Sequence, residues 1–540
     1  MNLIQDPWIP VRRRSGKEEI IAPWEITDNF ERNPFTQIAA PRPDFNGALI
    51  QFLIGMLQTC FAPHDTSDWR KKLRHPPSAE NLRKACFEVE AFFKVGGDDL
   101  RFMQDLTLRE ELETLQPAAL QERVKPIGDL LIDVPTGKTL RDNTDLFVKR
   151  GTVNALCPSC AATALFTLQT NGPSGGQGHR TGIRGGGPLT TLILADSLWA
   201  TCWLNVLEGD SFLRLTGNPE KRAPADQFPW LAPTRTSEEG KGTTPEDAHP
   251  IQIFWAMPRR IRLIFSEEPD LCGLCATETS AAVRSYITKN LGTNYLGPWK
   301  HSLSPYFVAS DGMPSPVHPQ TDGVGYRHWL GWVQGISDGK TRREPAAVVE
   351  RYLQKVSEDL RLWAFGYDMD NMKARCWYDS CMPLTVCDAR IQESFAFHVA
   401  AIIKSADIVA FESRTRVKEA LFPKGGEVKG DFSFISGRFW QETEPAFFAA
   451  LPTLRELLRN DSDVIPFLED WHNVLVRTSQ SIFNDLSQTG AFEAADPKRI
   501  ALAWRHLRMA LFGKKLKETL GLPVPVSGGA RRKGGTKSNA

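Results

Sequence analysis

Two cysteine pairs are the residues of this chain whose type and spacing most clearly suit chemistry. Cys157 and Cys160 form one CxxC pair, and Cys272 and Cys275 form the other. Four thiolates suit a tetrahedral zinc ion (Zn2+), with sulfur about 2.3 Å from the metal, and two intervening residues let one turn present both sulfurs. Such a site has no open position, so the predicted zinc is structural and links two distant segments. A redox-active dithiol is the alternative, but it leaves the second pair unexplained.

A glycine-rich segment lies between the two pairs. Residues 171–192 read NGPSGGQGHRTGIRGGGPLTTL and contain eight glycines, interleaved with His179, Arg180 and Arg184. Glycine lets a backbone approach a ligand closely, and the guanidinium of arginine pairs well with phosphate. An inert surface loop is the alternative. The zinc site expected just before the segment favours a loop whose geometry is used, because the metal would tether it.

The sequence shows no catalytic constellation that we can assemble. An HExxH motif is missing, and no pair of carboxylates is convincingly placed for acid–base chemistry. The sequence therefore predicts that the protein is not an enzyme. A zinc-containing nuclease or phosphohydrolase is the alternative, with His64, Asp65 or His179 in a metal-dependent site.

Length and composition indicate a soluble protein of more than one domain. The chain has 540 residues, which predicts two or three domains, and its formal charge of +1 means that nucleic acid could be bound only by local patches. Ten cysteines and an N-terminus without a secretory signal fit the reducing cytoplasm. The longest apolar stretch, residues 47–61, is shorter than the roughly 20 residues of a membrane span and predicts a buried helix. No membrane association is expected.

The fold class predicted for the chain is α+β. Residues 1–375 mix helical patches with short strand-like runs, such as residues 251–265, and are expected to form one large mixed domain that contains the zinc site. Residues 216–250 carry many turn formers and charges and are predicted to be an exposed insertion, whose role the sequence does not indicate.

The C-terminal part changes to helical periodicity. Amphipathic stretches beginning near residue 391 and at about 436–458, 464–487 and 497–520 predict an all-α four-helix bundle over residues 376–525. Asp496 followed by Pro497 is typical of a helix start. Residues 526–540 are rich in glycine and basic side chains and are predicted to be a disordered basic tail.

Several longer phrases together resemble one family. They are NLIQDPWIPV at the start, RFMQDL at 101–106, DLFVKRGTVNALCPSCAATALF at 145–166, GGQGHRTGIRGGGP in the glycine-rich segment, and GYDMDNMKARCWY at 366–378. They look like the CasA family, the large subunits of the type I-E CRISPR surveillance complex called Cascade. The resemblance extends from the first residues into the terminal helices and agrees with the division into a mixed part and a helical part.

The resemblance implies a non-catalytic role in RNA-guided antiviral defence. Subunits of this family recognise the short motif that flanks a target in double-stranded DNA, help to open the duplex, and recruit a helicase-nuclease. The implied partners are the other Cascade subunits, the guide RNA, double-stranded target DNA and the recruited helicase-nuclease.

The resemblance also implies which residues contact the flanking motif. Gly175, Gly176 and Gly178 match the loop that approaches the minor groove, where a degenerate pattern of acceptors tolerates several motifs. Lys289 matches a lysine that follows the second cysteine pair, and Asn371 matches the tip of a wedge that enters the duplex. Prising one base step apart costs about a few kcal/mol.

A separate segment is implied to contact the guide RNA. Phe147 matches an aromatic anchor, with Lys149 and Arg150 beside it, and an aromatic ring next to cations suits stacking on RNA. Basic residues of the terminal helices could hold phosphates of the displaced strand, although such residues are usually a solvated face. They are Lys498, Arg499, Arg505, Arg508, Lys514 and Lys515.

Overall fold

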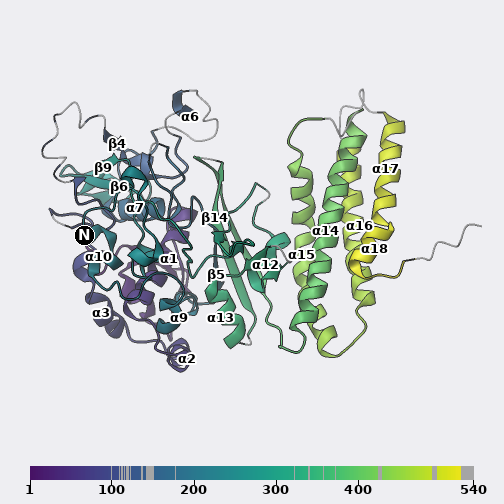
Figure 1. Cartoon of the computed structure of the whole chain (residues 1–540), viewed down its shortest axis with the longest axis horizontal. Coiled ribbons are helices and arrows are strands. Elements are labelled where there is room, and N and C mark those ends of the chain that lie inside the picture. Colours follow the sequence, from purple (N-terminus) through teal and green to yellow (C-terminus); the bar gives the residue numbers. More distant parts are fainter. Residues whose placement is uncertain are drawn as a thin grey trace, which may run out of the picture. The chain divides into compact units, whose positions relative to one another are not determined.

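The structure of the chain is a computed structural model (Figure 1). It describes residues 1–98, 100–108, 110, 114, 116, 121, 123–135, 138–141, 151–176, 178–321, 323–337, 341–356, 358–370, 372–423, 428–488 and 496–524. The chain divides into two compact units: residues 1–324 with 331–386, and residues 325–330 with the chain from 387 onward. The boundary expected at residue 375 falls within strand β15 (Lys373–Leu384), which belongs to the first unit.

The centre of the first unit is the helix α1 (Pro43–Cys60). Proline at the first helical position and Asp44 in the first turn favour a helix start, and a nearly continuous apolar run follows. Most of its residues are buried, and it contacts α7 (Pro158–Asn171), α8 (Leu198–Leu204) and α11 (Gln252–Trp255). The prediction of a buried helix over residues 47–61 is therefore confirmed.

The strands of this unit form small antiparallel sheets. In hydrogen-bonded order they are β2 (Glu18–Ile21), β1 (Ile9–Arg13) and β3 (Phe35–Ile38); β11 (Pro314–Pro316), β10 (Tyr306–Val308), β13 (Arg342–Glu344) and β12 (Ile336–Ser337); β15, β14 (Leu360–Asp370) and β5 (Thr190–Leu194); β4 (Val124–Pro126), β9 (Ala282–Lys289) and β6 (Arg260–Ser266); and β7 (Asp270–Leu271) with β8 (Glu278–Thr279). Shorter helices accompany them: α2 (Thr66–Arg74), α3 (Ala79–Phe87), α6 (Lys138–Arg141), α9 (Gly209–Leu213), α10 (Pro224–Gln227) and α13 (Ala347–Lys355). The division between the units at residues 330 and 331 falls within α12 (Trp329–Val333). The expected mixture of helices and strands is confirmed.

Two local predictions for this unit are wrong in part. Residues 216–250 are not simply an exposed insertion, because Phe228 and Trp230 are 1% and 0% exposed and pack against Phe93. The turn formers around these two aromatic residues concealed their place in the core. The apolar run 251–265 is not one strand, since its first part forms α11 and only the part after Pro258 forms β6.

The second unit contains long helices. They are α14 (Gln392–Leu421), α15 (Ser433–Arg459), α16 (Ile465–Gln488) and α17 (Pro497–Leu511), followed by the short α18 (Lys514–Leu520). The four long helices run side by side (Figure 1), and α14 contacts α15, α16, α17 and α18. The expected C-terminal helical region is confirmed.

The start of α17 follows the sequence signal, whereas its end does not. The carboxylate of Asp496 accepts hydrogen bonds from the amides of Lys498 and Arg499 at 3.0 and 3.2 Å, as its position before Pro497 predicts. The predicted single helix over residues 497–520 is interrupted at Phe512 and Gly513, which separate α17 from α18.

Helix α14 is long and apolar enough to cross a membrane by length and composition alone. Its most apolar 18-residue window has a mean hydropathy of 1.5. The same features are typical of the core helix of a soluble protein, and α14 is the helix that the other long helices of its unit contact. We therefore interpret α14 as a core helix.

Candidate nucleic-acid interface

The four cysteines predicted as metal ligands lie together. Their sulfur atoms are all within 4.8 Å of one another, and the Sγ atoms of Cys157 and Cys275 are 3.7 Å apart. Three of the four side chains are buried, and Cys275 is exposed. The prediction that the two distant pairs converge is confirmed, and the cluster has the geometry to hold a metal ion.

Backbone contacts position the two pairs. Cys157 is the N-cap of α7, and its Sγ atom accepts a hydrogen bond from the amide of Cys160 at 3.4 Å. The second pair lies in the turn between β7 and β8. The amide of Gly273, next to Cys272, donates to the carbonyl oxygen of Ala155 at 2.9 Å, so the two turns are joined directly.

The donor set of this cluster fits zinc. A tetrahedral ion with bonds of about 2.3 Å holds its sulfurs about 3.8 Å apart, and the separation of Cys157 and Cys275 is 3.7 Å. Hydrogen bonds from Cys157 and Cys160 hold the pKa of the Cys272 thiol far below its usual value. The hydrogen bond with Cys157, the one with Cys272, and burial raise the pKa of the Cys160 thiol. A bound divalent cation would stabilise all four groups as thiolates.

The glycine-rich segment leaves the end of α7 and returns to β5. Gly175 is exposed, and Gly176 and Gly178 are half-buried. The segment makes a tight turn, because the amide of Gly175 donates to the carbonyl oxygen of His179 at 3.1 Å and the amide of His179 donates to that of Gly176 at 2.9 Å. The backbone predicted to contact DNA therefore reaches the surface in a defined conformation.

Gly178 joins this loop to the end of β9. Its φ of +84° lies in the left-handed region, and a Cβ atom there would be 2.7 Å from Cδ2 and 2.9 Å from the amide nitrogen of Leu291. The amide of Leu291 donates to the carbonyl oxygen of Gly178 at 2.9 Å. Leu291 follows Lys289, the half-buried last residue of β9, by two positions. The loop and the segment that carries Lys289 are thus in direct contact.

The loop also contacts the tip of a long hairpin. Strands β14 and β15 pair as far as Asp370 and Lys373, with a shift of register between Asp368 and Met369. Asn371, the predicted wedge residue, lies outside the described residues, whereas its neighbour Met372 is 55% exposed. A Cβ atom on Gly176 would lie 3.5 Å from Sδ of Met372. Two segments predicted to contact DNA, 196 positions apart in the chain at Gly176 and Met372, therefore meet at the surface.

The base of this hairpin is anchored in the core. Residues 361–365 of β14 pair with β5, to which the glycine-rich segment leads. Farther along β14, the hydroxyl of Tyr367 donates to the carboxylate of Asp44 in α1 at 2.6 Å, and Nε of Arg42 donates to the same carboxylate at 2.9 Å. A hydrogen-bonded ion pair at the start of the central helix thus fixes the hairpin.

A second ion pair braces the hairpin near its tip. A bulge lies between Asp368 and Met369, and the guanidinium of Arg375 donates to both carboxylate oxygens of Asp368 at 2.9 and 2.7 Å. The hydrogen bond that it donates to Asp368 raises the pKa of the Arg375 guanidinium. The pair links the two strands across the bulge.

Some predicted residues cannot be located. Phe147, Lys149 and Arg150, predicted to contact the guide RNA, lie outside the described residues, as does the predicted tail at 526–540. In the part of the chain that the structure describes, no group of three or more potential metal ligands includes His64 or His179. The described residues therefore give the alternative of a zinc-containing nuclease or phosphohydrolase no group of metal ligands around His64 or His179.

Sequence reasoning missed two contributors to this surface: Leu291 and Arg259. The amide of Arg259 donates to the side chain of Gln169 at 2.9 Å, and its Nη2 atom donates to the carbonyl oxygen of Pro173 in the glycine-rich segment. No local pattern marks these residues, because each acts through a partner far away in the chain.

A comparison with known protein families decides what the chain is. Residues 2–482 match the family model described as CRISPR-associated protein Cse1. The chain belongs to the Cse1 family. Solved structures share its fold: CasA of Thermus thermophilus has a TM-score of 0.67 at 16% identity, over 95% of this chain and 99% of that one. Cse1 of Thermobifida fusca has a TM-score of 0.68 at 15% identity, over 96% and 98%.

Another match places this Cse1 fold in an assembly. A chain in a structure described as a CRISPR RNA-guided surveillance complex has a TM-score of 0.65 at 16% identity, over 95% of this chain and 99% of that chain. The expected resemblance to the large subunit of the type I-E complex is thereby confirmed.

Proposed function

We propose that this Cse1 protein is the non-catalytic subunit of an RNA-guided antiviral complex that recognises the motif flanking a target in double-stranded DNA. It reads the motif through the backbone of Gly175, Gly176 and Gly178, with Lys289 beside them. The tip of the β14–β15 hairpin, at Asn371, opens the adjoining base step. The subunit then helps to open the duplex and recruits a helicase-nuclease.

The observation that carries this proposal is the contact between the glycine loop and the hairpin tip. Backbone at glycine positions can approach closely in the minor groove, which is only about 6 Å wide, where larger side chains would not fit as well. The residue that separates the strands must lie next to the backbone that contacts the motif, so that recognition and strand separation act on neighbouring base pairs. The 3.5 Å approach of a Cβ on Gly176 to Met372 satisfies this requirement. Gly175 is exposed at the same tip.

We further infer that the ion held by the four cysteines is zinc and that it is structural. Four sulfur donors leave no position for substrate or water. The ion would link the start of α7 to the β7–β8 turn, and so fix the two segments from which the glycine loop and β9 depart.

The remaining roles follow from membership of the family and complete the proposal. Phe147, Lys149 and Arg150 contact the guide RNA, and the other Cascade subunits are partners. Residues 376–525 act as an up-and-down four-helix bundle, and the protein works in the cytoplasm without binding a membrane. The packing of α14 against its neighbours supports this arrangement of the helical unit.

Binding of DNA by the assembled complex tests the proposal. We expect Gly176→Val and Asn371→Ala to weaken binding to targets with the flanking motif, and to change binding to motif-free DNA little. Gly312→Val is the matched control for Gly176→Val, because Gly312 also has a positive φ, +80°, but a Cβ atom there meets nothing within 4 Å.

Two results would contradict the proposal. One is motif-dependent binding that both variants retain at the natural level. The other is hydrolysis of DNA by the isolated chain that is lost in His64→Ala or His179→Ala, which would favour the zinc-containing nuclease instead.

A further inference from the structure

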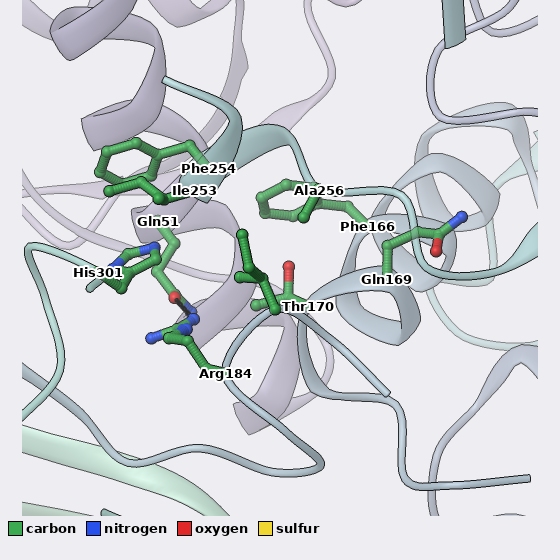
Figure 2. A pocket seen from close by; sticks show the side chains of 10 residues that line it. Gln51, Phe166, Gln169, Thr170, Arg184, Ile253, Phe254, Ala256 and His301 are labelled. Carbon is green, nitrogen blue, oxygen red and sulfur yellow. Dashed lines mark hydrogen bonds between the residues drawn. The ribbon is translucent and has the colours of Figure 1, made fainter. Parts of the chain in front are cut away.

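A small, largely buried cavity lies behind the glycine-rich segment, away from its exposed tip. Gln51 of α1, Thr170 of α7, Arg184 of the segment, Phe254 of α11 and His301 are among the residues that line it (Figure 2). It has room for about one water-sized particle. Any occupant must therefore be a water molecule or a small ion.

One wall of the cavity carries a positive charge without a negative partner in the described chain. Arg184 is 2% exposed. Its guanidinium donates to Oε1 of Gln51 at 2.6 Å, to Oγ1 of Thr190 at 3.0 Å and to Oγ of Ser304 at 2.9 Å, and all three acceptors are neutral. Burial lowers the pKa of Arg184 to about 10, which still leaves the group charged at neutral pH. Buried charges are normally compensated by an opposite charge, because their desolvation is costly.

A second wall presents a hydrogen-bond donor. His301 is 3% exposed, and its Nδ1 atom accepts a hydrogen bond from the amide of Leu303 at 3.1 Å, which places the proton of a neutral ring on Nε2. Burial and the charge of Arg184 hold the pKa of His301 well below its usual value, so the ring is neutral. The Nε2–H group is then a donor, and among the described contacts no acceptor in the chain takes it.

Gln51 offers the cavity no free acceptor, and Thr170 has a hydroxyl group that can donate a hydrogen bond to an anion. The side-chain oxygen of Gln51 already accepts from Arg184, and its amide nitrogen donates to the carbonyl oxygen of Gly47 at 2.8 Å. The ring of Phe254 packs edge-on against His301, with centroids 4.8 Å apart, and adds an apolar wall. A water molecule needs both donors and acceptors, whereas an anion needs donors and a positive charge.

We propose that this cavity is a binding site for one small monovalent anion, of which chloride is the physiological representative. The guanidinium of Arg184 and the Nε2–H group of His301 are its ligands. A single-atom anion needs less space in this cavity than phosphate or sulfate, which carry four oxygens around a central atom. The anion would neutralise the charge at the base of the glycine-rich segment and so hold that base against α1.

Two measurements on the chain without substitutions test this site. Crystals grown with bromide in place of chloride should show an anomalous peak in the cavity beside Arg184. At constant ionic strength, replacing gluconate by chloride should raise the midpoint of thermal unfolding by about 2–4 °C, since gluconate is too large to enter.

Two variants test whether the effect of chloride on the unfolding midpoint arises from the cavity. Arg184→Met should abolish the difference between chloride and gluconate. Arg180→Met, on the same segment, should keep it, because Arg180 donates to Ser237 at 2.9 Å and does not line the cavity.

The proposal is overturned by a natural chain whose crystals show no bromide peak at Arg184, or whose unfolding midpoint is equal in the two salts. A bromide peak without chloride-dependent stabilisation would indicate an adventitious ion only. Both decisive measurements use the natural chain, so they do not depend on the folding of a variant. None of them involves DNA, so their failure leaves the proposed function untouched.

Discussion

The substitution Gly178→Ala probes the contact that ties the glycine loop to β9. An L-residue at a φ of +84° costs about 1–2 kcal/mol. The added Cβ atom would also lie 2.9 Å from the backbone nitrogen of Leu291 and 2.7 Å from its side chain. The side chain can rotate away but the backbone cannot, so overpacking adds about 1–3 kcal/mol. We therefore expect the loop to detach more easily by about 2–5 kcal/mol.

Hydrogen exchange at the amide of Leu291 measures this change directly. In the natural chain that amide donates to the carbonyl oxygen of Gly178 at 2.9 Å, so its exchange reports on opening of the contact. A loss of about 2 kcal/mol or more should speed exchange by at least about 30-fold, since each 1.4 kcal/mol is a factor of ten. Motif-dependent DNA binding by the assembled complex should weaken as well.

The control separates backbone strain from the contact. Gly312→Ala carries the same positive-φ cost without a neighbour within 4 Å, so it should leave exchange at Leu291 and DNA binding unchanged. The reasoning is refuted if Gly178→Ala leaves the exchange of Leu291 at the natural rate. If exchange at Leu291 becomes faster but motif-dependent binding stays intact, the result supports the contact between Gly178 and Leu291 and contradicts its role in recognition.

Three further predictions concern the metal, the hairpin and the response to pH. Elemental analysis should find about one zinc per natural chain, and Cys272→Ser should lose that metal and lower the unfolding midpoint. Tyr367→Phe removes the 2.6 Å hydrogen bond to Asp44 and should cost about 1.5–3 kcal/mol in a denaturant titration; an unchanged midpoint would contradict the anchoring role. The hydrogen bond from Arg13 lowers the pKa of Glu19 from 4.5 to about 2, so this carboxylate stabilises the fold above pH 4.5 and loses its effect as the pH falls towards 2. The difference in unfolding midpoint between the natural chain and Glu19→Gln should therefore shrink over that interval.

Signals that are local in the chain predicted the structure well. The two CxxC spacings identified the sulfur cluster because each pair is built within one turn. Asp496 before Pro497 identified the start of α17 for the same reason, since a cap and its helix are neighbours.

Contacts between distant segments could not be predicted in this way. Nothing near Gly178 indicates that Leu291, 113 positions later, occupies the space of its missing side chain. Likewise, Phe228 and Trp230 lie among charges and turn formers, and only the aromatic cluster around Phe93 explains their burial. Periodicity describes one element at a time, whereas these positions are decided by the packing of several.

The hairpin of β14 and β15 is held firmly at its base and less firmly at its tip. Among the described residues, 361–365 of β14 pair with strands on both sides, and Tyr367 is held to Asp44 by a hydrogen bond. Beyond Tyr367, β14 is paired with β15 alone in the described chain. A two-stranded ribbon of this kind bends most readily where its ladder is interrupted, and here that place is the bulge after Asp368. The ion pair between Asp368 and Arg375 crosses this bulge. Weakening the ion pair should therefore make the tip of the hairpin more flexible and reduce the force that the tip can exert, while the average position of the tip stays unchanged.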